Sequence, residues 1–136
     1  MTPFTAQDAL LAAMILTAAA DGEMTESERR AIDDAVSGLP AFSGFDHARL
    51  GDLTAVVVET LGEEAGVEQT IRLVGEALPD GLRETAYALS CEVAAADGRV
   101  ALEEMRLLEL LRHGLEIDRL IAAALERAVR ARHARG

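Results

Sequence analysis

Apolar residues along this chain recur at the spacing of amphipathic helices. The run Val67, Ile71, Val74 and Leu78 follows a 4-3-4 spacing, which places the four side chains on one face of a helix. No segment alternates apolar and polar residues for long enough to predict a strand, and the valine triplet at 56–58 lies inside a helical pattern. The pattern therefore predicts an all-α fold.

Glycine, proline and Asp-Gly pairs interrupt this pattern and divide the chain into about seven helices. Glycine adopts the left-handed conformation in which helices end, and proline cannot continue a helix. Thr25 and Glu28 have the spacing of a capping box, in which each side chain bonds to the backbone amide of the other residue. The predicted helices cover about 4–20, 25–39, 46–61, 67–78 and 82–96, with a sixth that ends near Leu115 and a seventh that starts at Asp118.

The first predicted helix is apolar on nearly every side. Its apolar run, Ala9 to Ala20, holds 12 residues, fewer than the roughly 20 that cross a bilayer. Asp8 precedes the run, and the N-terminus lacks the basic start of a secretory signal peptide. We therefore expect a helix buried at the centre of a soluble domain, and no membrane span.

Two segments of the chain repeat at an offset of 76 residues. Both read Ala-Ala-Ala-Asp-Gly, at 18–22 and 94–98, and each has a Glu seven residues after the Asp, Glu28 and Glu104. The chain is thus predicted to be one domain, residues 1–136, with an internal duplication. The first repeat covers about 4–62, the connector helix 67–78 and the second repeat about 80–134. The first and fifth helices would then pack together about a pseudo-two-fold axis.

The doubled hinge resembles the TerB-like family of tellurite-resistance proteins. The resemblance rests on Ala-Ala-Asp-Gly with its following Glu, in two copies, and covers roughly residues 4–129. It implies a compact bundle of about seven helices and a role in bacterial stress resistance. It also implies metal sensing or binding, or an adaptor role, rather than an established enzymatic activity. The second copy differs, because Ala101 stands where the first copy has Thr25 and so lacks the hydroxyl cap.

The formal net charge of −11 is spread unevenly. Residues 1–126 contain nine Arg and all 24 acidic residues, a net charge of −15, whereas the last ten residues contain four Arg and no acid. A net charge this negative on residues 1–126 repels nucleic acid and anionic lipid, and favours the binding of cations or of a partner with a basic surface. The acidic residues are also explained as the solvated outer faces of helices.

The Arg-rich tail, the last ten residues, is either a frayed terminus or a segment that docks on an acidic surface.

The acids at the two hinges form a candidate metal site. Asp21 and Asp97 end one helix, and Glu28 and Glu104 begin the next, so the four carboxylates converge if the hinges adjoin. Their oxygens suit a hard divalent cation such as Ca²⁺ or Mg²⁺. The spacing is not that of an EF-hand loop, which needs Gly at position six and Glu at position twelve. Further acids lie nearby, namely Glu23, Glu26 and Glu103. The alternative is that the hinge acids only end and cap helices.

The remaining chemically active residues predict little. The single cysteine, Cys91, excludes an intramolecular disulfide and a Cys-based zinc site, and it falls on Ile15 in the repeat, which predicts a core position. Glu92 falls on Leu16, so it is either a buried acid or a sign that the fifth helix is more exposed there. The three histidines are expected at the surface or at helix ends: His47, His113 and His133.

The sequence contains no nucleophile motif, no His ligand set and no Gly-rich phosphate loop, and therefore does not predict an enzyme. We expect a cytoplasmic, non-enzymatic TerB-like stress or tellurite-resistance protein that binds a divalent cation at its hinges. The alternative is a metal-free acidic adaptor that engages a basic partner.

Overall fold

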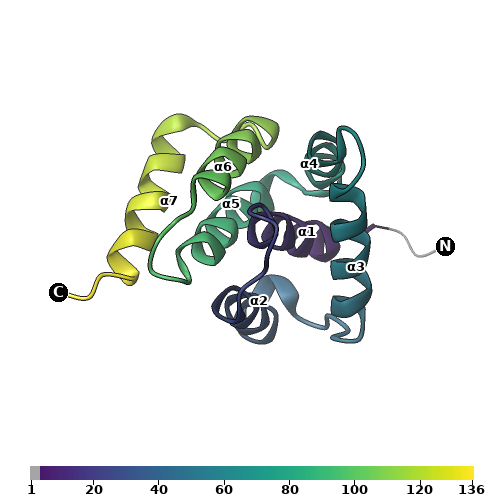
Figure 1. Cartoon of the computed structure of the whole chain (residues 1–136), viewed down its shortest axis with the longest axis horizontal. Coiled ribbons are helices and arrows are strands. Elements are labelled where there is room, and N and C mark those ends of the chain that lie inside the picture. Colours follow the sequence, from purple (N-terminus) through teal and green to yellow (C-terminus); the bar gives the residue numbers. More distant parts are fainter. Residues whose placement is uncertain (1–3) are drawn as a thin grey trace.

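The first helix, α1 (Ala6–Ala18), lies at the centre of the structure, a computed structural model that describes residues 4–136 (Figure 1). Every residue from Asp8 to Ala18 is buried. The helix starts two residues later than predicted because Thr5 caps it. The Thr5 hydroxyl accepts the Asp8 amide at 3.1 Å, and the Asp8 carboxylate accepts the Thr5 amide at 2.9 Å. The prediction of a central, buried first helix is confirmed.

Six further helices and one short 3-10 turn complete the described chain. They are α2 (Glu26–Gly38), the 3-10 turn η1 (Pro40–Phe42), α3 (Arg49–Leu61), α4 (Gly66–Ala77), α5 (Asp80–Ala95), α6 (Leu102–Gly114) and α7 (Arg119–Arg132). Residues 4–136 contain no strand, so the all-α prediction is confirmed. No helix in this range is long and apolar enough to cross a membrane. The third helix starts later than predicted, because the Asp46 carboxylate accepts the Ala48 amide at 3.0 Å and holds a turn.

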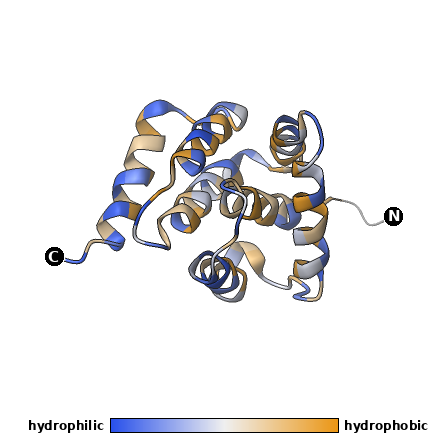
Figure 2. Cartoon of the chain, viewed as in Figure 1, coloured by the Kyte–Doolittle hydropathy of each residue, from blue (hydrophilic) through white to orange (hydrophobic). Residues whose placement is uncertain are grey.

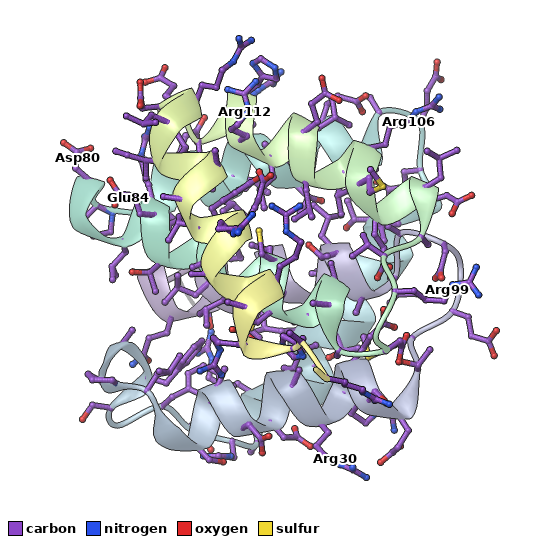
Figure 3. The ribbon with its side chains drawn as sticks, turned by 90° about the vertical axis from the view of Figure 1, so that its left-hand side faces the viewer. Arg30, Asp80, Glu84, Arg99, Arg106 and Arg112 are labelled. Carbon is purple, nitrogen blue, oxygen red and sulfur yellow. The ribbon has the colours of Figure 1, made fainter. Side chains whose placement is uncertain are left out.

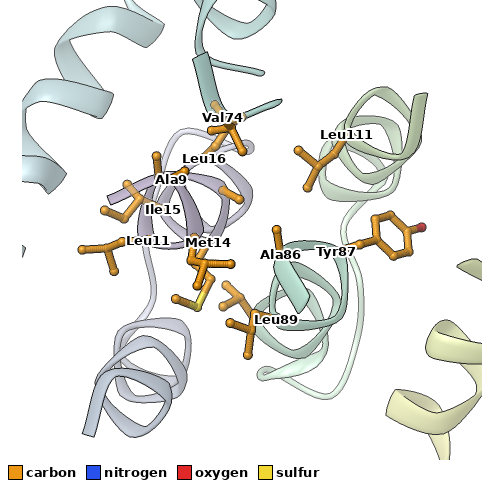
Figure 4. Packing of buried hydrophobic residues seen from close by; sticks show 14 of the residues in the cluster. Ala9, Leu11, Met14, Ile15, Leu16, Val74, Ala86, Tyr87, Leu89 and Leu111 are labelled. Atoms are coloured by element: carbon orange, nitrogen blue, oxygen red, sulfur yellow. The ribbon is translucent and has the colours of Figure 1, made fainter. Parts of the chain in front are cut away.

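The helices are arranged around α1 rather than in parallel layers. α1 contacts α2, α3, α4, α5 and α6, and α7 packs on α5 (Figure 1). Val74 from α4, Leu111 from α6 and Ala86 from α5 approach α1 from different sides (Figure 4). Apolar residues accordingly concentrate on α1, whereas hydrophilic residues are prominent on α2 (Figure 2). The central helix thus supplies the surface on which most of the other helices bury their apolar faces.

The C-terminal end of α7 is fastened to α5 by polar contacts. Arg132 Nε donates to Glu92 Oε1, and His133 Nε2 lies 2.9 Å from Glu92 Oε2. The Glu92 side chain is partly exposed, with 26% of its surface accessible. Glu92 is therefore neither fully buried nor free, and two residues within the Arg-rich tail dock on this acid of the same chain.

The ends of α4 and α6 approach each other closely at two glycines. A Cβ atom on Gly114 would lie 2.2 Å from Ile71 Cγ2, and one on Gly75 would lie 3.4 Å from the Gly114 carbonyl oxygen. Arg83 reinforces this junction, because its guanidinium donates to the Gly75 carbonyl at 3.0 Å and to the Leu115 carbonyl at 3.3 Å. The absence of a side chain at position 114 therefore allows α6 to pack on α4.

We predict that Gly114→Ala destabilises the fold, because the new methyl group must displace Ile71. The expected loss is about 1–3 kcal/mol of unfolding free energy, measured by urea denaturation. Gly38→Ala is the matched control, since Gly38 ends α2 at the position equivalent to Gly114 and a Cβ there meets nothing within 4 Å. An equal loss in both variants would contradict the packing explanation.

Candidate functional site

The two Asp-Gly hinges have the same local conformation. Gly22 has a φ of 93° and Gly98 a φ of 83°, in the left-handed region that glycine adopts without strain. Each glycine amide donates to the carbonyl three residues earlier, at 3.0 Å. α2 and α6 then begin four residues after their glycines. The predicted offset of 76 residues therefore holds for the hinges, whereas a duplication of the whole unit stays a prediction.

A glutamate in the first turn of α2 and of α6 bonds back to its own N-cap residue. Glu28 Oε1 accepts the Thr25 amide at 2.8 Å, and the Thr25 hydroxyl accepts the Glu28 amide at 3.1 Å. This is the predicted capping box. Glu104 Oε1 accepts the Ala101 amide at 3.1 Å, but Ala101 has no hydroxyl to return the bond. Both glutamates thus fix the start of a helix.

The two hinges meet through Thr25 and Asp97. The Thr25 hydroxyl donates to the Asp97 carboxylate, at 2.9 Å from Oδ1 and 3.2 Å from Oδ2. These residues are 72 positions apart in the sequence. One hydroxyl therefore accepts a bond within its own hinge and donates a bond to the other, and the hinges lie side by side.

Glu28 and Glu104 form a buried carboxyl pair at this junction. Their exposed fractions are 1% and 2%. Glu104 Oε2 is buried, and no group among residues 4–136 donates a hydrogen bond to it. The Glu28 carboxyl is near enough for a hydrogen bond to Glu104, but two carboxyl groups can bond only when one of them carries a proton. The pair therefore needs a proton or another cation.

The pKa of Glu104 is raised from 4.5 to about 8. Burial contributes most, because it penalises the charged form, and the hydrogen bond with Glu28 comes next. The negative charges of Glu28 and Asp21 act in the same direction, whereas the bond from the Ala101 amide lowers the pKa. Burial and the neighbouring carboxyl group therefore favour a proton on this pair.

Asp21 contributes charge to this site rather than a direct contact. Its side chain is exposed, and its Oδ1 accepts the Glu23 amide at 3.2 Å. The other nearby acids are also exposed, namely Glu23, Glu26 and Glu103. No group of three or more His, Cys, Asp or Glu within residues 4–136 is arranged to hold a metal ion. The structure thus gathers the predicted acids into one neighbourhood without forming a closed ligand cage.

A second polar cluster, which the sequence did not indicate, lies between α5 and α7. The Tyr87 hydroxyl donates to Glu126 Oε2 at 2.6 Å, on the wall of a cavity of about 430 Å³ that also contacts Cys91. Burial raises the pKa of Tyr87, and burial followed by the charge of Glu126 raises the pKa of Cys91 to about 12. Cys91 is buried and stays a thiol, as expected of a core residue. The signal available beforehand was that Tyr87 falls on Leu11 in the repeat, which places a hydroxyl at a core position.

The helical bundle and its adjoining Asp-Gly hinges define the chain as a small all-α domain with a paired-hinge site. A family model described as "Tellurite resistance protein TerB" matches residues 7–127. The chain therefore belongs to the TerB family, and the resemblance found in the sequence is confirmed. No curated protein and no solved structure matches the chain.

We predict that the free energy of unfolding falls as the pH rises from about 4.5 to about 8. In this range native Glu104 keeps a proton that the unfolded chain has released, so raising the pH favours unfolding. Glu104→Gln should remove this part of the pH dependence, since glutamine cannot titrate. Its side-chain carbonyl oxygen still accepts the Ala101 amide, and its NH2 group, in place of Glu104 Oε2, can donate to the Glu28 carboxylate.

Above about pH 8, Glu104→Gln should therefore be more stable than the natural protein, by about 1–3 kcal/mol. Urea denaturation at a series of pH values measures the difference. Glu103→Gln, at an exposed neighbouring position, is the control for loss of one negative charge. Parallel pH profiles for the natural protein and Glu104→Gln would show that this carboxyl does not titrate as described.

Proposed function

We propose that this member of the TerB family is a non-enzymatic protein that binds a divalent cation between its two Asp-Gly hinges. The observation that supports this proposal is Glu104 Oε2, a buried carboxyl oxygen to which no group among residues 4–136 donates a hydrogen bond, beside the buried carboxyl group of Glu28. Leaving such an oxygen unsatisfied is costly in a protein interior. A cation would satisfy it and neutralise the pair.

The ligands are divided between fixed and movable groups. Oε1 of Glu28 and of Glu104 already accepts an N-cap amide, so the other oxygen of each carboxylate remains for the ion. Asp97 and Asp21 lie on the exposed hinges, and each would turn toward the pair to become a ligand. Carboxylate oxygens, completed by water, are the ligands that Ca²⁺ and Mg²⁺ prefer. Binding would therefore leave both helix caps in place.

A cation at this position would connect the two halves of the chain. One hinge joins α1 to α2 and the other joins α5 to α6, so an ion held by both would tie together helices that are distant in sequence. An ion that binds only the folded protein also raises its stability, by about 2.7 kcal/mol at a concentration one hundred times the dissociation constant. Such a response suits an ion-sensing component of stress or tellurite resistance.

We predict saturable binding of at least one divalent cation to chelator-stripped protein, and loss of that binding in the double variant Asp21→Asn with Asp97→Asn. Asparagine keeps the acceptor oxygens used by the Glu23 amide and the Thr25 hydroxyl, so the variant should fold. Calorimetric titration with Ca²⁺, Mg²⁺, Mn²⁺ and Zn²⁺ measures the affinity, and circular dichroism checks the fold. The affinity should fall at least about tenfold, because two negative charges at the site are lost.

The matched control is Asp33→Asn with Asp34→Asn, which removes the same charge from an exposed part of α2. Binding should be unchanged in this variant. The proposal fails if no ion produces heat or a thermal shift, or if both double variants weaken binding equally. The hinge acids would then act as helix caps, and the metal-free adaptor would become the working hypothesis.

A further inference from the structure

A cleft with an apolar lining opens between α3 and α6, next to the first hinge. Its volume is about 730 Å³. We call it the α3–α6 cleft, and its apolar lining includes Leu16, Ala20, Met24, Val58, Leu61 and Leu110. Clefts of this size and lining commonly bind small molecules through apolar contacts and a few polar groups at the rim.

The chain itself leaves part of this lining exposed. Val58 on α3 has 50% of its surface accessible and Leu110 on α6 has 46%. α3 and α6 each pack on α1, so the two helices act as opposite walls while the end of α1 forms the floor. Leu16 on that floor is only 1% exposed. A bound apolar group would cover the two exposed walls and exclude water from them.

Two arginines give the rim of the cleft its charge. Arg29 on α2 and Arg106 on α6 line the cleft, and neither forms an ion pair with any acid of residues 4–136 within 4.0 Å. The only acid among the lining residues is Glu103. The cavity beside Tyr87 differs, because two glutamates accompany its two arginines. The α3–α6 cleft therefore has a locally positive rim in a chain whose net charge is −11.

We infer that the α3–α6 cleft binds a small amphipathic acid, with its apolar chain or ring against α3 and α6 and its anionic head at Arg29 and Arg106. Guanidinium groups bind carboxylate and phosphate oxygens in a planar, two-bond geometry. The ligand is a free molecule rather than a membrane surface, because the floor at Leu16 is recessed. This site is separate from the cation site and does not depend on it.

The test compares probes that share one apolar tail and differ in the charge of the head. Dodecanoate, dodecyltrimethylammonium and neutral dodecyl maltoside are titrated below their micelle-forming concentrations into the whole chain, with calorimetry and amide chemical shifts as readouts. Dodecanoate should bind saturably at one site and shift amides that line the cleft, such as those of Ala20, Met24 and Leu110. The cationic and neutral probes should bind at least about tenfold more weakly, since each lacks the charged contact to arginine.

Substitution of the rim then tests the head-group contact. Arg29→Gln with Arg106→Gln should weaken dodecanoate binding at least about tenfold. Arg30→Gln with Arg99→Gln removes the same charge from exposed positions that do not line the cleft, and binding should be retained. Arg99 and Arg106 lie on the right-hand side of Figure 3, Arg30 at its lower edge, and Asp80 and Glu84 on the left. This control therefore loses two positive charges, as the test variant does, without changing the lining of the cleft.

Substitution of the wall tests the apolar contact independently. Val58→Asp places a carboxylate inside the cleft, whereas Val56→Asp places one on α3 outside it, at a residue that is 58% exposed. Both changes are at exposed positions of one helix, so both variants should fold, and only Val58→Asp should abolish binding. The inference is overturned if all three probes bind with equal affinity, or if the chemical shifts that change centre on Tyr87 and Cys91. It is also overturned if Val58→Asp retains binding. Anionic phospholipid vesicles are a further probe, and binding to these alone would overturn it as well.

Discussion

The burial of α1 on every side is the constraint on which the rest of the structure depends. A helix pairs its backbone amides and carbonyls internally except at its ends, so it can be enclosed without unsatisfied backbone groups. Most polar side-chain atoms of α1 find partners within the same arrangement, although Asp8 Oδ1 is buried without a hydrogen-bond partner among residues 4–136. The Thr17 hydroxyl donates to the Ala13 carbonyl at 2.9 Å, and Asp8 pairs with Arg49 on α3. The surrounding helices then need only one apolar face each.

The position of α1 also decides where the hinges lie. α1 and α5 pack against each other, and each leads into an Asp-Gly hinge on the same side of the molecule, where Thr25 meets Asp97. The first-turn glutamates of α2 and α6 are thereby brought together in the interior. Two carboxyl groups in such a place cannot both be charged at low cost. The site is therefore an acidic pair that the fold buries, rather than an acidic patch on the surface.

The first hinge adjoins two environments of opposite character. It leads into α2, where Glu28 belongs to the buried carboxyl pair, and its residues Gly22 and Met24 border the α3–α6 cleft with its two arginines. Charge in this chain is thus organised locally, although the net charge of −11 describes the whole as acidic. A protein with a negative net charge can still bind an anion as well as a cation, because charged groups in contact with the ligand outweigh distant charges that the solvent screens.

The sequence by itself determined the helices, the central position of α1, the Thr25 capping box and the set of hinge acids. Each of these depends on residues within a few positions of one another, through helical periodicity or cap chemistry. The tertiary structure alone decided the contact of Tyr87 with Glu126, the docking of Arg132 on Glu92, the approach of Gly114 to Ile71 and the cleft between α3 and α6. These features join residues far apart in the chain, and they depend on the distances and angles at which helices pack, which no local pattern encodes.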